Sequence, residues 1–201
     1  NQLLQDAQIL AQLDVLASLA AVAEAYDYCR PTLNDGYDLE IVDGRHPVIE
    51  RTLPAGQPYI PNDVQLSPID CQIMIITGPN MSGKSALLRQ TALIVIMAQM
   101  GSFVPATSAT IGIVDSVYTR VGASDNIAVG ESTFMVEMQE AASILNNLTP
   151  RSLILFDELG AGTDPIEGAA LAAAIIESAR EMGALVAATT HYAELKVYAM
   201  T

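Results

Sequence analysis

The sequence predicts an α/β fold in which a mostly parallel central sheet lies between layers of helices, with a helical arm at the N-terminus. The first observation is that apolar, strand-like runs alternate with helical segments from residue 73 to the end of the chain. The second is that glycine-rich or acidic residues follow these runs directly, as at the carboxyl edge of a parallel sheet. The third is size: 201 residues, 51% of them hydrophobic, can bury the core of one domain.

The first segment predicts a helix over residues 1–29, because apolar residues recur there at helical spacing. Pro31 and Gly36 end this pattern. We therefore expect a helical arm over residues 1–30 and a domain over residues 31–201 that is truncated at its C-terminus. Periodicity leaves two interpretations open: a linker from an upstream region, or a helix that packs on the domain.

Two short strands are predicted next, over residues 39–42 and 59–66. Pro61 near the start of the second run favours an edge position, because proline cannot donate to a central ladder. Tyr59 offers an aromatic platform for a purine base. From spacing alone, a half-buried tyrosine that only packs is the commoner outcome.

A phosphate-binding loop is predicted within residues 73–85. An apolar run ends at Thr77, a G-x-x-x-x-G-K-S motif (Walker A) follows, and an apolar segment of helical length continues over residues 86–100. Gly78 and Gly83 let successive backbone N–H groups point at an anion. The helix that follows adds its positive N-terminal end.

Two side chains of this loop carry the predicted chemistry. Lys84 supplies a charge for the β- and γ-phosphates, and the Ser85 hydroxyl can ligate Mg²⁺, so the expected cofactors are ATP and Mg²⁺. The predicted nucleotide-binding residues are Gly78, Pro79, Asn80, Met81, Ser82, Gly83, Lys84, Ser85 and Ala86. The alternative is a glycine turn with an incidental Lys-Ser pair, which the flanking strand and helix disfavour.

The middle of the chain predicts a strand over residues 117–121, a polar loop over 122–133 and a helix over 134–148. Ser132 stands just before this helix, and Glu137 follows in its first turn. Capping and the helix dipole are sufficient explanations for both residues from the sequence alone.

Residues 152–158 predict a buried strand that ends in two carboxylates, as in a Walker B element. Asp157 would hold Mg²⁺, usually through water, and Glu158 would orient or deprotonate the attacking water. The pairing with Lys84 and Ser85 favours this interpretation over two surface acids.

The C-terminal part predicts a helix over residues 167–182, a buried strand over 184–189 and a helix over 192–200. His191 follows this strand directly. A histidine at the carboxyl edge of a parallel sheet can sense a γ-phosphate, while the alternative is a loop histidine that faces solvent.

Charge and cysteine usage limit the class of protein. The net charge of −14 argues against this segment being a nucleic-acid-gripping surface, although it permits such a role elsewhere in a longer protein. Cys29 and Cys71 lack metal-ligand spacing and fit reduced thiols in a cytoplasmic protein. The apolar run over residues 93–97 is too short to span a bilayer, so we expect no membrane contact.

Five segments carry a resemblance to a known family: GRHPV at 44–48, ITGPNMSGKS at 76–85, GSFVPA at 101–106, TRVGA at 119–123 and GESTFMVEM at 130–138. They resemble the ATPase domain of the MutS family of DNA mismatch repair proteins. The resemblance covers essentially residues 1–160, and the N-terminal arm looks like the end of the family's core helices.

This resemblance implies an ABC-type P-loop ATPase that works as a dimer of ATPase domains. It implies that Asn80 reaches the γ-phosphate, Tyr59 stacks on adenine, Ser132 reaches the partner's ATP and His191 is the switch histidine. The implied partners are ATP and ADP, a second copy of the domain, and mismatched or branched DNA bound through other domains.

After Gly160 the pattern departs from mismatch repair proteins. Residues 161–172 and 190–196 look instead like MutS paralogues that lack mismatch-recognition domains. We therefore expect a hybrid, either a fusion near residues 159–160 or a divergent natural member. Besides a hydrolysing domain, two alternatives stay open: a nucleotide-binding scaffold with little hydrolysis, and a DNA-binding module, which the acidic balance disfavours.

Overall fold

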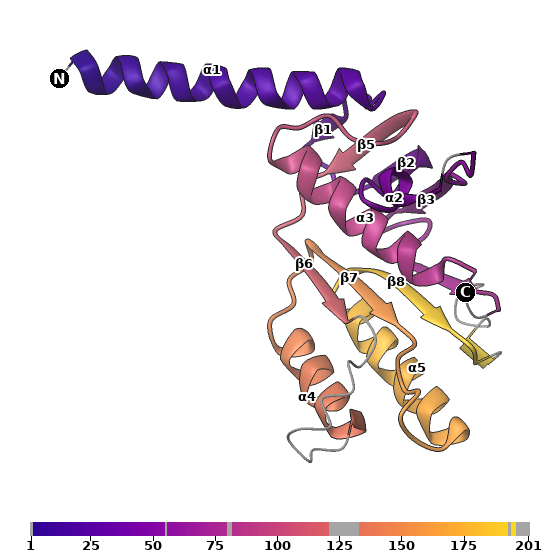
Figure 1. Cartoon of the computed structure of the whole chain (residues 1–201). Helices are drawn as coiled ribbons and strands as arrows, with labels where there is room; N and C mark the ends of the chain where they lie inside the picture. Colours follow the sequence, from indigo (N-terminus) through magenta and orange to yellow (C-terminus); the bar gives the residue numbers. More distant parts are fainter. Residues whose placement is uncertain (1, 55, 80–81, 121–132, 193, 196–201) are drawn as a thin grey trace.

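Two four-stranded sheets with their helices form the body of the molecule, and a long helix extends from it (Figure 1). The computed structural model describes residues 2–54, 56–79, 82–120, 133–192 and 194–195. The elements in chain order are α1 (Gln2–Ala25), β1 (Thr32–Asn34), β2 (Leu39–Gly44), α2 (Ile49–Thr52), β3 (Asn62–Leu66), β4 (Ile73–Thr77), α3 (Lys84–Gln99), β5 (Ser108–Gly112), β6 (Ser116–Arg120), α4 (Thr133–Asn146), β7 (Ser152–Asp157), α5 (Pro165–Glu181) and β8 (Leu185–Thr190).

The second sheet is parallel throughout, in the order β4-β8-β7-β6. Successive side chains of a strand point to opposite faces, and β7 shows this clearly. Leu153 and Leu155 join the core that contains Leu88 of α3, whereas Ile154 and Phe156 join the core beneath α4 and α5. The sheet therefore lies between two helical layers (Figure 1), and the predicted α/β fold with a mostly parallel sheet is confirmed.

The first sheet is mixed, in the order β1-β5-β2-β3, and was not predicted as a separate sheet. Its strand β2 runs antiparallel to both β3 and β5, and β3 lies at the edge, as Pro61 predicted. Helix α3 packs between the two sheets, because its buried side chains share one core with Ile41 of β2 and Leu155 of β7. The strands predicted over residues 39–42 and 59–66 thus lie in this mixed sheet, outside the parallel one.

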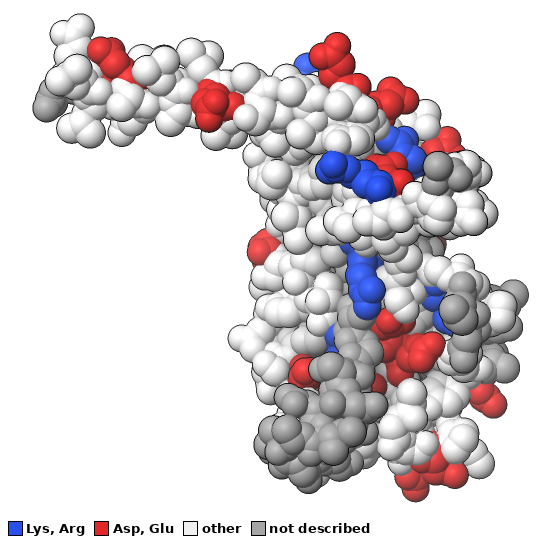
Figure 2. All heavy atoms as spheres, in the orientation of Figure 1, with Lys and Arg blue, Asp and Glu red and all other residues white. Residues whose placement is uncertain are grey.

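Helix α1 confirms the predicted N-terminal helix, although it ends at Ala25 rather than at residue 29. Its apolar side chains are mostly exposed, and Figure 2 shows it as largely uncharged surface. By length and composition alone, α1 is a helix that could cross a membrane, and 6% of an apolar 18-residue stretch of it is buried in the structure. One such helix near a chain end is weak support for a membrane span, because helices that pack in larger proteins have the same composition.

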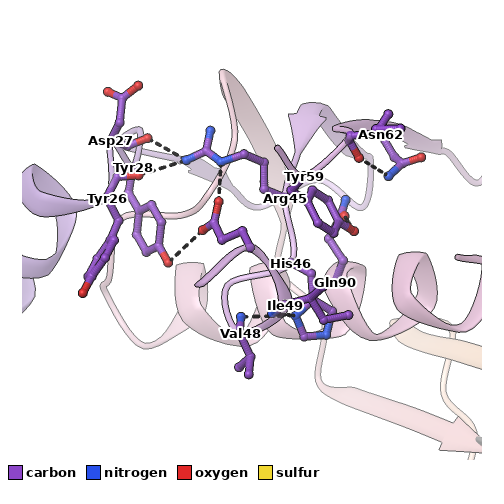
Figure 3. Close-up of polar contacts among 12 residues, drawn as sticks. Tyr26, Asp27, Tyr28, Arg45, His46, Val48, Ile49, Tyr59, Asn62 and Gln90 are labelled. Carbon is purple, nitrogen blue, oxygen red and sulfur yellow. Dashed lines mark hydrogen bonds and ion pairs between the residues drawn. The ribbon is translucent and has the colours of Figure 1, made fainter. Parts of the chain in front are cut away.

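An arginine joins the end of α1 to the mixed sheet. Arg45 donates through its guanidinium to the backbone oxygens of Tyr26 (3.0 Å) and Asp27 (2.9 Å), and its Nε contacts Glu50 at 2.8 Å (Figure 3). Arg51 lies 4.3 Å above the Tyr26 ring. These contacts fix the segment that follows α1 against the residues after β2.

Candidate functional site

The candidate site lies at the carboxyl ends of β4, β8 and β7, which are neighbours in the parallel sheet. The last residues of β4 and β7 both pair with the end of β8: Thr77 with Thr190, and Asp157 with Thr189. The segments that follow the three strands therefore begin side by side at one edge of the sheet. Ligands of open parallel sheets bind at this kind of edge.

The start of α3 presents backbone donors at this edge. Gly83 precedes the helix with φ of 89°, a conformation that favours glycine. The first intrahelical bond runs from Leu87 N to Gly83 O (2.9 Å), so the N–H groups of Lys84, Ser85 and Ala86 have no helical acceptor. Such N–H groups at the positive end of a helix form an anion-binding site.

Lys84 is the first residue of α3, and its side chain folds back over the loop. The residue is 7% exposed, and Nζ donates to the backbone oxygens of Gly78 (2.9 Å) and Pro79 (3.1 Å). The ammonium group is thus held over the predicted phosphate loop. Asn80 and Met81 of that loop lie outside the described residues.

The two acids that follow β7 occupy different environments. Asp157 is 6% exposed, and its Oδ1 accepts a hydrogen bond from Thr189 Oγ1 at 2.6 Å. Glu158 has φ of 54°, which is uncommon for a residue with a side chain, and its N–H donates to the same Thr189 oxygen at 2.9 Å. Backbone strain of this kind is concentrated at functional sites.

Glu158 and His191 are in direct contact at the mouth of the site. His191 Nε2 lies 2.8 Å from Glu158 Oε1, and both side chains are exposed, 45% and 42% respectively. The structure therefore brings together three predicted site residues from two strands: Asp157, Glu158 and His191.

Oxygen donors at this edge suit magnesium in the presence of a phosphate. Ser85 supplies a hydroxyl and Asp157 a carboxylate, and the described residues contain no group of three or more His, Cys, Asp or Glu that could hold a metal by themselves. Mg²⁺ is usually bound through one or two carboxylates, with substrate phosphates and water completing its shell. The donor set fits this mode of binding.

The roles named from the family resemblance all remain predictions, those of Asn80 and His191 included. Tyr59 is half-buried, and its hydroxyl donates to Gln90 Oε1 at 2.9 Å. Ser132 lies outside the described residues, as does most of the helix expected over residues 192–200.

Two buried residues beside the site have contacts that the sequence did not predict. Glu137 was expected to favour the helix dipole, but it is 5% exposed and its Oε1 accepts the Gly160 N–H at 2.8 Å. A signal existed, since Glu137 interrupts the apolar face formed by Phe134 and Ala141. Thr189 has no comparable signal, because threonine is common in buried strands.

Comparisons with known proteins agree with the geometry. The family model described as MutS domain V matches residues 74–201. The chain is 59% identical over 198 residues to a DNA mismatch repair protein MutS from Salinibacter ruber, covering 97% of this chain and 22% of that protein. It is 63% identical over 175 residues to the MutS of Cytophaga hutchinsonii (87% and 20%) and 62% identical over 173 residues to that of Porphyromonas gingivalis (86% and 19%).

The chain spans about a fifth of the length of these relatives. Both the family model and the Salinibacter match include residues on each side of 159–160, so the comparisons give the hybrid interpretation no support. Residues after Gly160 are part of the same match as residues before it. The chain therefore belongs to the MutS family.

Proposed function

We propose that this chain is an ATP-binding and Mg²⁺-dependent ATP-hydrolysing domain with an ABC-type P-loop fold. The observation that carries the proposal is the common edge of β4, β8 and β7, where the start of α3, His191 and the Asp157–Glu158 pair meet. The proposed substrate is ATP with water, and the products are ADP and phosphate.

The backbone N–H groups of residues 80–86 would bind the phosphate oxygens, and Lys84 Nζ would exchange its two loop carbonyls for β- and γ-phosphate oxygens. Ser85 and Asp157 would hold Mg²⁺, which neutralises developing charge on the phosphates. The oxygen of a water molecule would attack the γ-phosphorus. The bond between the γ-phosphorus and the oxygen that bridges the β- and γ-phosphates would break, and ADP would leave.

Glu158 would take the proton of that water, and His191 would hold the carboxylate in place through its 2.8 Å contact. The positive φ of Glu158 aims this side chain away from the direction that an extended strand would give it. We assign catalysis to Lys84, Glu158 and His191.

The remaining proposals concern a longer protein of which this chain would be one part, because the chain spans about a fifth of the length of its relatives. There we propose DNA mismatch repair, with ATPase domains paired as a homodimer and mismatched or branched DNA bound by other domains. Asn80 would reach the γ-phosphate, Tyr59 would stack on adenine, and Ser132 would act on the partner's ATP.

The division into an arm over residues 1–30 and an ATPase domain over 31–201 belongs to the same set of proposals. Other parts of the longer protein would cover the exposed apolar side chains of α1. Cytoplasmic localisation is supported by the two unpaired cysteines, Cys29 and Cys71.

A nucleotide-binding scaffold with little hydrolysis is the second candidate function. The hydrogen bonds from Lys84 Nζ to the Gly78 and Pro79 backbone oxygens favour this candidate, because Lys84 must break both of them to bind phosphate. It is also favoured by the need for a serine from a second copy, as the family resemblance implies.

Phosphate release and nucleotide binding, measured together, separate the two candidates. We expect wild type to bind ATP and release phosphate at a rate per chain that rises with protein concentration. Glu158→Gln should bind ATP and lose about 100-fold or more of the rate, whereas Lys84→Ala should lose binding. Glu181→Gln, an exposed acid at the end of α5, is the matched control. Binding without turnover in wild type would select the scaffold, and equal turnover in Glu158→Gln would remove the role of Glu158.

A further inference from the structure

Gln90 is a fully buried amide whose presence packing does not explain. It lies in α3 and is 0% exposed. Its Oε1 accepts the Tyr59 hydroxyl at 2.9 Å, while its Nε2 has no hydrogen-bond partner among the described residues. A buried donor without a partner destabilises a fold, and leucine would fill similar space without that cost. The contact with Tyr59 is therefore the feature that distinguishes glutamine from an apolar residue here.

The surroundings hold this amide in one place. Gly44 of β2 lies against it, because a Cβ built on Gly44 would be 2.5 Å from Gln90 Nε2. Figure 3 shows the Gln90 side chain beside the Tyr59 ring, above α3. Burial raises the pKa of the Tyr59 phenol, and nearby Glu50 raises it further, so the hydroxyl keeps its proton at neutral pH.

The position of Gln90 along α3 links the ring to the phosphate loop. Gln90 is six residues after Lys84, which corresponds to about 9 Å along a helix axis. Tyr59 comes from the segment before β3, more than twenty residues earlier in the sequence than the helix. One hydrogen bond thus connects this distant segment to the same rigid helix whose first turn presents the phosphate-binding donors.

We propose that Gln90 is a positioning residue for nucleotide recognition: its hydrogen bond fixes the Tyr59 ring at a set distance from the phosphate loop, so that purine base and triphosphate are bound together. This inference rests on the proposed function, in which the chain binds ATP and Tyr59 contacts the base. It assigns to Gln90 an effect on the base half of the nucleotide and none on the phosphate half. Fixing a contact before binding raises affinity because less conformational freedom is lost.

The test is calorimetric binding of two probes, Mg²⁺–ATP and inorganic tripolyphosphate with Mg²⁺, to the 201-residue chain. Tyr59→Phe removes the hydroxyl and keeps the ring, and Gln90→Leu removes the amide. We expect each variant to weaken ATP binding by about 3- to 10-fold, as for loss of one hydrogen bond, and to leave tripolyphosphate binding unchanged. The double variant should lose no more than either single variant, because both remove the same bond.

Gln99→Leu is the matched control. This glutamine lies at the other end of α3 and exchanges two hydrogen bonds with the Val114 backbone, at 3.0 Å and 2.8 Å. Its loss should leave the affinities for both probes unchanged. Should Gln90→Leu fail to fold, Tyr59→Phe still decides the matter, since it deletes one oxygen atom.

Three results would overturn the inference: unchanged ATP affinity in Tyr59→Phe, additive losses in the double variant, or an equal loss for tripolyphosphate. Each of them leaves ATP binding by wild type in place. A wild-type chain that binds neither probe would instead refute the proposed function itself.

Discussion

Thr189 joins the two acids of the candidate site through a single oxygen atom. Its Oγ1 donates to Asp157 Oδ1 at 2.6 Å and accepts the Glu158 N–H at 2.9 Å. Thr189 stands opposite Asp157 in the parallel pairing of β7 with β8, so this geometry follows from the strand register. Strand β8, which lies between β4 and β7, thus helps to set the direction in which the chain leaves β7.

We predict that Thr189→Val lowers the free energy of unfolding by about 2 kcal/mol, because it leaves the buried Asp157 carboxylate without this donor and leaves the Glu158 N–H with only its longer bond to the Thr189 backbone oxygen, at 3.2 Å. Valine has nearly the same shape, so packing changes little. Urea denaturation measures the effect. Thr91→Val is the control: among the described residues the hydroxyl of this buried threonine bonds only to the Leu87 backbone oxygen within α3, and we expect a loss below about 1 kcal/mol. Equal losses of unfolding free energy in Thr189→Val and Thr91→Val would show that the Thr189 hydroxyl contributes no more to stability than a single hydrogen bond within a helix.

Glu137 provides a second prediction about the turn after β7. Its carboxylate accepts the N–H of buried Gly160, and glutamine can keep that acceptor while leucine cannot. We expect Glu137→Leu to lower the free energy of unfolding by about 1–3 kcal/mol and Glu137→Gln to lower it much less.

Gln139→Leu, an exposed change in the same helix, is the control for Glu137 and should stay within about 0.5 kcal/mol of wild type. Denaturation curves for the set decide the question. If leucine and glutamine at position 137 behave alike, the hydrogen bond to Gly160 contributes nothing measurable.

The parallel sheet was predictable from sequence because β4, β7 and β8 contain apolar runs and each of the three leads directly into a predicted site residue or loop. All six residues of β7 and all six of β8 are buried, which produces the continuous apolar runs from which both strands were inferred. The loop from Gly78 to Ser85 added a fixed spacing, and with it the order strand, loop, helix.

The mixed sheet was not predictable by the same reasoning. Its strand β1 has three exposed residues, and β5 begins with an exposed serine and ends with glycine, so neither shows a period-2 apolar pattern over enough length. The bonding partners of Thr189, Glu137 and Gln90 could not be predicted either, because each depends on which strands and helices become neighbours rather than on local spacing. For Glu137, the interrupted apolar face signals an unusual position but not its bond to Gly160.

Tyr37 makes stability depend on pH in the alkaline range. Its hydroxyl donates to the Ser152 backbone oxygen and accepts the Leu185 N–H at 3.2 Å, and burial raises its pKa to about 12 from the ordinary 10.0. Between these values the unfolded chain loses the phenol proton while the folded chain keeps it. The free energy of unfolding therefore contains a contribution that is complete below about pH 10 and falls as pH rises toward about 12.

Tyr37→Phe removes this titration together with the two hydrogen bonds. We expect the variant to be less stable at neutral pH and to show a shallower decline in stability than wild type between about pH 10 and about pH 12. Thermal unfolding followed by circular dichroism across that range gives both curves. Curves that stay parallel would mean that the phenol titrates alike in the folded and unfolded chains.

Gly168 of α5 sets two opposing effects against each other. Alanine favours a helix interior over glycine by about 1 kcal/mol, so helix propensity alone predicts that Gly168→Ala is stabilising. A Cβ at this position would overlap the Gly160 backbone oxygen and Tyr192 Oη, however, and the backbone atom cannot rotate away. Overpacking of this kind costs about 1–3 kcal/mol. The Tyr192 hydroxyl also donates to Gly160 O at 2.8 Å, so the overlap would disturb this bond beside the candidate site.

We therefore expect Gly168→Ala to be destabilising by about 1 kcal/mol or more in spite of the gain in propensity. Ala170→Gly, an exposed change in the same helix, measures the propensity difference by itself and should cost about 1 kcal/mol. The free-energy cost of the overlap at Gly168 is then the destabilisation measured for Gly168→Ala plus the propensity difference measured for Ala170→Gly. The two terms are added because the gain in helix propensity offsets part of the cost of the overlap in Gly168→Ala. A Gly168→Ala variant that is more stable than wild type would show that the turn after Glu158 can move away from α5, and Gly160 would then not be held by its close contact with the helix.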